Sequence, residues 1–563
     1  MVRREWASSA TLRVIRRPGE RLHAWLRGSP SGLVALALTV GVGAGVGAVV
    51  FRYLILWVTM LLTGHADYSV ADHAANPLVS RLGMWFVVLA PVVGGLAYGP
   101  LVEFFAREAR GHGVPEVMFA VAEQGGRIRP QVAVVKSIAS AVCIGSGGSV
   151  GREGPIVQIG SALGSALGQA LRVSESRLRL LVACGAAGGI SATFNAPIAG
   201  VMFALELILR DFEAHSFGVV VLASVAANVI GRAAFGSGAF LALPAFKLTS
   251  LWEYLLYTGL GLLASVTGVA FIRILYGVED LVDGLWRGPE WLRPAVGGVA
   301  LGGLLLALPE MYGVGYPVLE RAIGDGYGSA FLTVLLIGKI LATSVTIGIG
   351  GSGGVFAPSL FIGSMLGTAY GHLLHGVLPG LAGPAGAYGL VGMGAVFAAA
   401  ARAPITAVLI IFELTGDYQI ILPLMFAIAL AARIGSFLSQ DTIYTLKLRR
   451  RSVDITRHAR SGLMAALRVG DAMEPIPEGV PQEIPLDQVI ARFAREERTV
   501  GELARETPAI TEDQNLEQAL TVLVHSEDSG VPVLSTDRRT VVGWLTHQGV
   551  LRAYHERMKS AGS

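Results

Sequence analysis

A glycine-rich segment that occurs twice constrains this chain more than any other feature. The two copies read GSGGSVGREGPIVQIGSALG from Gly145 to Gly164 and GIGGSGGVFAPSLFIGSMLG from Gly348 to Gly367, and eleven of their twenty positions are identical without a gap. In each copy a glycine loop precedes a proline, Pro155 or Pro358, and an apolar run follows. Proline is favoured at the start of a helix, where the first backbone amides have no partner within the helix. Because these amides lie at the positive end of the helix dipole, each copy predicts a helix start that binds an anion.

The repeat lies in a chain with the composition of a membrane protein. Hydrophobic residues make up 53% of the 563 residues and charged residues only 15%, which is typical of a chain that crosses the bilayer several times. Several apolar runs are too short to cross about 30 Å of hydrocarbon alone. Backbone that is not helical at that depth must line a cavity or be buried in protein. We therefore predict an all-α polytopic membrane protein that holds an anion between broken helices of two internal repeats.

The similarity between the two halves extends beyond the glycine loops. It divides the membrane part into repeats of about residues 33–235 and 250–440, and from the residues alone both inverted and parallel halves are possible. The further matching pairs are Gly111–Pro115 with Gly313–Pro317, Lys136 with Lys339, and Ala196–Glu206 with Ala403–Glu413.

Basic residues flank the apolar part of the chain. By the positive-inside rule both ends are predicted to be cytoplasmic, with residues 1–32 as a basic segment and residues 33–450 as the membrane domain. The run from Leu33 to Thr63 is long enough to span the bilayer, and Gly64 to Arg81 is expected to form an external loop. The flanking basic residues are Arg3, Arg4, Arg13, Arg16, Arg17, Arg21 and Arg27 at one end, and Lys447, Arg449, Arg450 and Arg451 at the other.

Four motifs in the membrane part resemble those of the CLC family of chloride channels and proton/chloride exchangers. GREGP spans Gly151 to Pro155, FNAP spans Phe194 to Pro197, GGVFAP spans Gly353 to Pro358 and DTIYT spans Asp441 to Thr445. The similarity covers about Gly111 to Tyr444. It implies an inverted-repeat, all-helical homodimer in a bacterial inner membrane, with a separate anion pathway in each subunit, chloride as the transported ion and no cofactor.

The resemblance assigns the outer part of the anion pathway to the first glycine loop. Arg152, Glu153 and Gly154 match the outer anion-binding loop, and Glu153 is similar to the family's gating glutamate. The chemistry of the residues agrees, since a carboxylate beside convergent amides is itself an anion at an anion site and leaves when it is protonated. The alternative is that Glu153 only stabilises the start of its own helix.

The central part of the pathway is assigned to three other segments. The backbone amides of Val355 and Phe356 are the expected donors from the second glycine loop. Tyr444 matches the family's inner tyrosine, whose hydroxyl donates to the central anion, although an isolated tyrosine near the end of an apolar run is more often an interfacial belt residue. His112 and Gly113 occupy the loop in which the chloride-type sequence has serine at the position of His112.

His112 is the departure from the chloride-type loop that bears on the anion preference of the chain. A neutral histidine donates one N–H, and a protonated histidine adds a positive charge. We therefore expect pH-dependent binding or flux of chloride and related small anions. The alternative is that the His112 side chain turns away and the site uses backbone amides alone.

The proton pathway of the family is incomplete in this sequence. The best-known exchangers carry a proton-transfer glutamate immediately after the position of Glu206, where this chain has Leu207. Leucine cannot relay a proton, which favours passive, gated chloride conduction. A proton-coupled antiporter that uses water chains or Glu206 is the alternative. Glu206 and Glu413 occupy matching positions in the two repeats, so a structural polar contact is also plausible for both.

The tail, residues 451–563, is water-soluble in composition and resembles paired CBS regulatory modules, so we expect a small cytoplasmic α/β domain. Val531–Leu534, a polar turn through Arg539, Val541–Thr546 and a following helix fit one complete unit. A preceding unit that begins near Val469 is expected to be cut short, because Val500–Ala504 already restarts the pattern.

Gly549 stands where nucleotide-binding CBS modules usually place an acid that holds a ribose. Glycine cannot replace a bidentate carboxylate, so adenine nucleotide binding by the tail is not expected. A structural or dimerising tail is favoured.

Other function classes find little support in the residues. The sequence shows no Ser/His/Asp pairing, no metal-ligand spacing and no P-loop, so neither an enzyme nor a metal site is expected, and no nucleic-acid partner is indicated. A membrane sensor or receptor that uses the CBS-like tail is the alternative from a different class. A cation transporter would need more acidic residues in the membrane than Glu153, Glu206 and Glu413.

Overall fold

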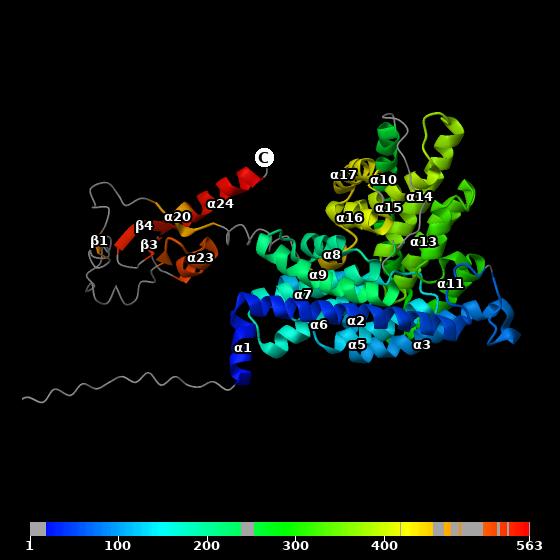
Figure 1. Ribbon diagram of the computed structural model, residues 1–563, viewed down its shortest axis with the longest axis horizontal. Helices are drawn as coiled ribbons and strands as arrows, with labels where there is room; N and C mark the ends of the chain where they lie inside the picture. Colours follow the sequence, from blue (N-terminus) through cyan, green and yellow to red (C-terminus); the bar gives the residue numbers. More distant parts are fainter. Residues whose placement is uncertain are drawn as a thin grey trace, which may run out of the picture. The chain divides into compact units, whose positions relative to one another are not determined.

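The computed structural model describes residues 18–71, 73–236, 238, 253–416, 418–453, 467–474, 484–485, 510–525, 530–536 and 540–561. The chain forms two compact units, Met1–Val453 and Asp454–Ser563. The first unit is helical and the second is α/β (Figure 1). The predicted fold class, an all-helical membrane part with a small α/β tail, is therefore confirmed. Arg3, Arg4, Arg13, Arg16 and Arg17, the restart at Val500–Ala504 and the turn at Arg539 lie outside the described residues.

The helices of the first repeat begin and end near the glycines and prolines of the sequence. Prolines occupy the first turn of α2, α4 and α8, as expected for a residue whose missing N–H costs nothing there. The elements are α1 (Pro18–Gly28), α2 (Pro30–Thr63), η1 (Ser80–Trp85), α3 (Phe86–Phe105), η2 (Arg107–Ala109), α4 (Val114–Glu123), α5 (Gln131–Gly145), α6 (Glu153–Leu171), α7 (Glu175–Phe194), α8 (Pro197–Phe203), η3 (Ala204–Leu209) and α9 (Ala214–Phe235).

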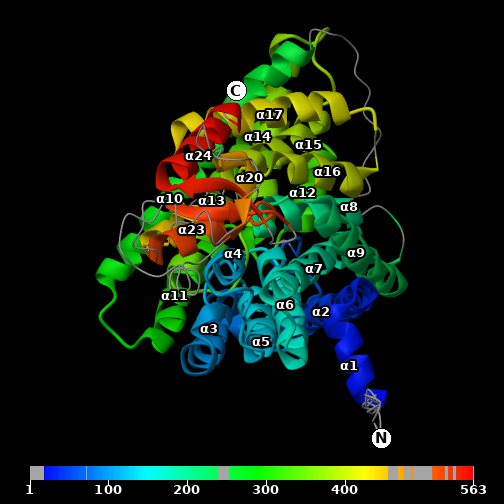
Figure 2. The same ribbon diagram turned by 90° about the vertical axis from the view of Figure 1, so that its left-hand side faces the viewer.

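The second repeat contains a corresponding series of helices, and α18 follows it. Its elements are α10 (Glu253–Leu285), η4 (Glu290–Leu292), α11 (Arg293–Ala307), η5 (Pro309–Met311), α12 (Tyr316–Ile323), α13 (Ser329–Gly348), α14 (Phe356–Val377), α15 (Ala385–Ala401), α16 (Pro404–Thr415), α17 (Ile421–Leu438) and α18 (Thr445–Arg450). Figure 2 shows the blue and cyan helices of the first repeat beside the green and yellow helices of the second.

Matching glycines allow the central helices of each repeat to approach closely. A Cβ added at Gly160 of α6 would lie 2.1 Å from the Gly185 carbonyl oxygen of α7. At the equivalent place in the second repeat, a Cβ at Gly363 of α14 would lie 2.2 Å from the Gly392 carbonyl oxygen of α15. Glycine at these positions therefore fixes the same packing of α6 on α7 and of α14 on α15.

Six of the described helical segments are long and apolar enough to cross a membrane. They are Pro30–Thr63, Ser80–Phe105, Ala214–Phe235, Glu253–Leu285, Ser329–Gly348 and Ile421–Leu438. Shorter apolar helices such as Gln131–Gly145 and Ala385–Ala401 lie among them. This combination of long and broken helices is the one that the short apolar runs predicted.

The tail forms a four-stranded sheet with helices from the same unit. The strands are β1 (Ile484–Pro485), β2 (Ile510–Thr511), β3 (Gly530–Leu534) and β4 (Thr540–Thr546), in the order β1-β4-β3-β2, and the helices are α20 (Val469–Ala472), α23 (Leu516–His525) and α24 (His547–Ala561). The β3 and β4 strands pair antiparallel, as the expected strand, turn and strand require.

Val469, with which the shortened unit was expected to begin, packs into the complete unit. Its amide donates to the Gln514 carbonyl oxygen at 2.8 Å, and its side chain shares one core with Leu516, Val531 and Val550. The segment therefore completes the core of the unit that contains β3 and β4.

Candidate functional site

The two glycine loops meet, and their helices begin at the same place. The Gly151 amide donates to the Gly354 carbonyl oxygen at 2.7 Å, and the Gly354 amide donates to the Gly151 carbonyl oxygen at 2.6 Å. This reciprocal antiparallel pairing is the contact expected where two inverted copies meet on a two-fold axis. Helix α6 begins at Glu153 and helix α14 at Phe356, so the first amides of both helices lie next to this junction.

The loop that contains His112 lies against the second glycine loop. The Gly111 amide donates to the Gly351 carbonyl oxygen at 3.0 Å, and the Gly353 amide donates to the Gly111 carbonyl oxygen at 3.3 Å. Gly113, with φ of 82°, is the N-cap of α4, a backbone conformation that favours glycine. Three predicted segments of the anion pathway are thus neighbours in space.

Two buried lysines bind backbone carbonyl oxygens of the Gly111 loop and of its counterpart, the Gly313 loop. Lys136 Nζ donates to the carbonyl oxygens of Ala109 at 2.9 Å and Gly111 at 2.8 Å. Its counterpart Lys339 donates to the carbonyl oxygens of Gly313 and Val314 and to Ser149 Oγ. Because these carbonyls bind the lysines, the amides on the other side of the loops remain available for an anion.

The Glu153 side chain is almost completely enclosed, with 1% of its surface exposed. Its Oε1 accepts a hydrogen bond from the Tyr316 hydroxyl at 2.7 Å, and Arg152 Nε lies 3.9 Å from the same oxygen. A Cβ at Gly151 would lie 2.2 Å from its Oε2, and the backbone amides of Glu153 and Ala357 also interact with the carboxyl group. The carboxyl group is therefore folded back over the loop junction, and it interacts electrostatically with Tyr444.

The His112 ring is also buried, with 1% exposed. Within the described residues neither ring nitrogen has a hydrogen-bond partner. The ring centroid lies 6.1 Å from that of Tyr276, whose hydroxyl donates to the Ile443 carbonyl oxygen, next to Tyr444, at 2.7 Å. Since buried polar groups without partners cost free energy, this ring is suited to donate to a bound anion.

Glu206 and Glu413 are used as reciprocal helix caps. Glu206 accepts from the amides of Ile405 at 3.2 Å and Thr406 at 2.8 Å, and from the Thr406 hydroxyl. Glu413 accepts from the amides of Ile198 at 3.0 Å and Ala199 at 2.7 Å. Each carboxylate thus satisfies the first amides of a helix in the other repeat.

Leu207, the neighbour of Glu206, is buried with 6% of its surface exposed. Its hydrocarbon side chain has no group that exchanges a proton. The position that the family resemblance associates with proton transfer is therefore filled by an apolar side chain.

Tyr316 is the main site residue that sequence reasoning missed. It occupies the place of Val114 in the repeat, directly before Pro317. A tyrosine at a position where the other copy has valine was the available signal. Its partner could not be read from the sequence, because Glu153 lies in the other repeat.

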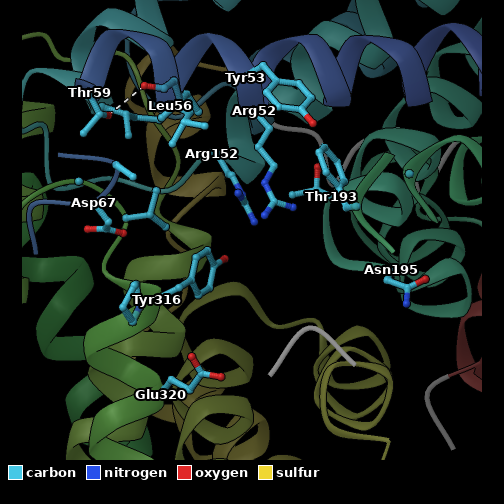
Figure 3. Close-up of a pocket in the computed structure, with 18 of the residues that line it drawn as sticks. Arg52, Tyr53, Leu56, Thr59, Asp67, Arg152, Thr193, Asn195, Tyr316 and Glu320 are labelled. Atoms are coloured by element: carbon cyan, nitrogen blue, oxygen red, sulfur yellow. Dashed lines mark hydrogen bonds between the residues drawn. The ribbon is translucent and has the colours of Figure 1, made fainter. Parts of the chain in front are cut away.

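A pocket of about 600 Å³ adjoins the gate region. Its lining includes Arg52 from α2, Arg152 at the start of α6, and Tyr316 from α12. Figure 3 shows the Arg52 and Arg152 side chains pointing into the same part of this pocket. Tyr316 thus contacts Glu153 on one side and the pocket on the other.

Comparison with known proteins identifies the family. The model of the voltage gated chloride channel family matches residues 94–436. The chain belongs to the CLC family. Among CLC relatives, a ClcB-like protein of Ralstonia nicotianae is 36% identical over 76% of this chain and 98% of its own length. The H(+)/Cl(-) exchange transporter ClcA of Vibrio vulnificus is 34% identical over 75% of this chain and 90% of its own length.

Solved CLC structures share the fold. A slow cyanobacterial Cl-/H+ antiporter aligns with a TM-score of 0.66 at 26% identity, covering 74% of this chain and 97% of that protein. A eukaryotic CLC transporter aligns with a TM-score of 0.61 at 21% identity, covering 92% of this chain and 97% of that protein. These likenesses and the family match confirm the predicted family and membrane-protein class.

Proposed function

We propose that this protein conducts chloride and related small anions through a gated pathway past Glu153, without obligatory proton coupling. The observation that carries the proposal is the place of the Glu153 carboxyl group, at the junction where α6 and α14 begin. A carboxylate at a site suited to anions competes with the transported ion. Protonation removes this competition, so the gate opens as the carboxyl group is neutralised.

The anion is expected to be held by groups from four segments. The amides of Gly113, Gly154, Val355 and Phe356, the Tyr444 hydroxyl and one His112 N–H replace part of its water shell. The two unpaired ring nitrogens of the buried His112 support its inclusion. Arg152 contributes positive charge on the Glu153 side.

Absence of an internal relay group favours passive conduction. Leu207 is apolar, and the Glu206 carboxylate is bound by two amides and a hydroxyl. These hydrogen bonds favour the charged carboxylate over the protonated one. We therefore infer that Glu206 is a structural residue, and no cofactor or metal takes part.

Proton-coupled exchange is the second candidate, and the names of the relatives favour it. Relatives of 34% identity are named H(+)/Cl(-) exchange transporters, and a structural relative is a Cl-/H+ antiporter, whereas the ClcB-like relative carries a chloride channel name. In this mechanism Glu153 carries the proton and water links it to the inner side. It would give uphill proton movement in a chloride gradient.

Reconstituted liposomes distinguish the two candidates. Chloride efflux and proton uptake are recorded together under a chloride gradient, for the wild type and for Glu153→Ala. Passive conduction gives chloride efflux without coupled protons. Proton uptake that runs uphill and is lost in Glu153→Ala would overturn the passive mechanism and establish exchange.

We also infer a homodimer in the bacterial inner membrane with both chain ends in the cytoplasm. The CLC relationship and the basic flanks of the apolar part support this arrangement. The tail is proposed to be structural. A Cβ at Gly549 would lie 2.6 Å from the Ala472 carbonyl oxygen, which leaves little room for the acid of a nucleotide site.

A further inference from the structure

Arg52 is a charged residue in an otherwise uncharged membrane helix. It is the one Asp, Glu, Lys or Arg among the 34 residues of α2. It lies eleven residues before the end of that helix at Thr63, a distance of about 16 Å at 1.5 Å per residue. A charge at such depth is costly unless it faces water, a counter-ion or a transported ion. The gating mechanism described above does not use it.

The surroundings of Arg52 supply water access and a second positive charge. The guanidinium Cζ lies 4.1 Å from the centroid of the Phe235 ring, and the group lines the 600 Å³ pocket. It interacts electrostatically with Arg152, and Figure 3 shows both side chains directed to the same part of the pocket. Two like charges repel one another, and an anion between them would replace repulsion with two attractions.

The acidic residues of the pocket lie away from the two arginines. Asp67 and Glu320 also contribute to its lining. Asp67 Oδ1 accepts hydrogen bonds from the Ser69 amide at 2.9 Å and the Ser69 hydroxyl at 2.6 Å. Figure 3 shows both acids apart from the two arginines. The part of the pocket nearest the arginines is therefore the part that favours an anion.

We propose that Arg52 and Arg152 form an outer anion-binding site that collects a small monovalent inorganic anion before it passes Glu153. The ligand class is a halide or an ion of similar size, held by guanidinium N–H groups. The inference rests on the proposed anion transport and adds a site to it. Arg152 and Tyr316 connect this site to the gate, since both line the pocket, Arg152 Nε lies 3.9 Å from Glu153 Oε1 and the Tyr316 hydroxyl donates to the same oxygen.

Bromide gives a direct test of the site. Crystals of the full-length protein are soaked in bromide, and anomalous scattering locates the ion. We expect a peak between the Arg52 and Arg152 guanidinium groups that Arg52→Gln abolishes and Arg52→Lys retains. A wild-type pocket with no bromide, at a concentration that fills the central site near Tyr444, overturns the proposal.

Flux measurements test whether the site serves transport. In Arg52→Gln the KM for chloride should rise by about tenfold, at the low end of electrostatic steering effects, with kcat unchanged. Arg52→Lys should restore KM because it restores the charge. The matched control is Arg81→Gln, which removes an exposed positive charge from η1 outside the pocket lining.

Three results overturn the proposal: an unchanged KM in Arg52→Gln, an equal rise in Arg81→Gln, or a rise in Arg52→Gln that lysine does not correct. A different result would reject the proposed anion transport itself. In that case a peak between the arginines would support the binding site, while an absence of chloride flux in the wild type would reject anion transport.

Discussion

The hydrogen bond from Tyr316 to Glu153 predicts how strongly the gate is held closed. The bond is 2.7 Å long and ends on a carboxyl group that is 1% exposed. A hydrogen bond to a charged group contributes about 1.5–3 kcal/mol net. Tyr316→Phe removes the hydroxyl and keeps the ring that contacts Phe194. It should therefore make the open gate about 10 to 150 times more favourable relative to the closed gate.

This change should appear as a shift in the pH dependence of chloride flux. Wild-type flux is expected to rise as pH falls, since protonation neutralises the carboxylate that competes with the anion. Because a tenfold change in an equilibrium corresponds to one pH unit, Tyr316→Phe should move the midpoint upward by about one to two units. The assay is chloride efflux from liposomes at a series of pH values.

Two controls separate gating from general damage. Tyr312→Phe removes another buried hydroxyl, which donates to the Gly145 carbonyl oxygen at 2.8 Å and does not contact Glu153. It should leave the midpoint in place. In a Glu153→Ala background, which removes the acceptor of this hydrogen bond, Tyr316→Phe should cause no further change in flux, because the two residues act through one interaction. An unchanged midpoint in well-folded Tyr316→Phe protein, or full additivity with Glu153→Ala, would refute the reasoning.

Three further predictions follow from the same contacts. His112→Ser should flatten the part of the pH dependence that remains in Glu153→Gln, as measured by efflux; an identical pH profile would contradict a contribution of His112 to the pH dependence. Glu206→Gln should lower the free energy of unfolding by about 0.5–2 kcal/mol through loss of a helix cap, and Glu413→Gln should cause a similar loss. Thermal unfolding in detergent measures this stability, and chloride efflux should be unchanged in both variants. A selective loss of proton movement in Glu206→Gln would contradict the structural role. The full-length protein should show no ATP binding by equilibrium dialysis, and Gly549→Asp should not create it because the Ala472 carbonyl oxygen occupies the adjacent space.

The anion-binding loops could be predicted from the sequence because short residue patterns determine where their helices begin. A glycine loop followed by proline fixes where a helix begins, and Glu153 stands at the first position of α6 as that pattern predicts. The duplication then relates Gly151 to Gly354 across the two halves. These inferences needed only short stretches of chain and their repetition, so the fold class and the neighbouring loops could be predicted.

Contacts between distant residues could not be predicted in the same way. Tyr316 is 163 residues from Glu153, and no periodicity connects a tyrosine on α12 with a carboxyl group at the start of α6. The role of Arg52 likewise depends on which side of α2 faces the pocket. In the tail, the Val469 segment was assigned to a separate shortened unit because its sequence resembles a unit start, whereas its packing is decided by the core it helps to fill.

The reciprocal helix caps formed by Glu206 and Glu413 bear on the choice between passive conduction and proton-coupled exchange. Glu206 and Glu413 hold equivalent helix starts in opposite repeats, so the two-fold relation of the halves is sufficient to explain a glutamate at both places. In the proposed passive mechanism neither residue takes part in proton movement, and Leu207 provides no substitute. Among the described residues, we propose that Glu153 is the carboxyl group that exchanges a proton with the outer side. Coupling would require water to reach Glu153 from the inner side past His112 and Tyr444. The proton measurement in liposomes therefore tests whether such a water path forms.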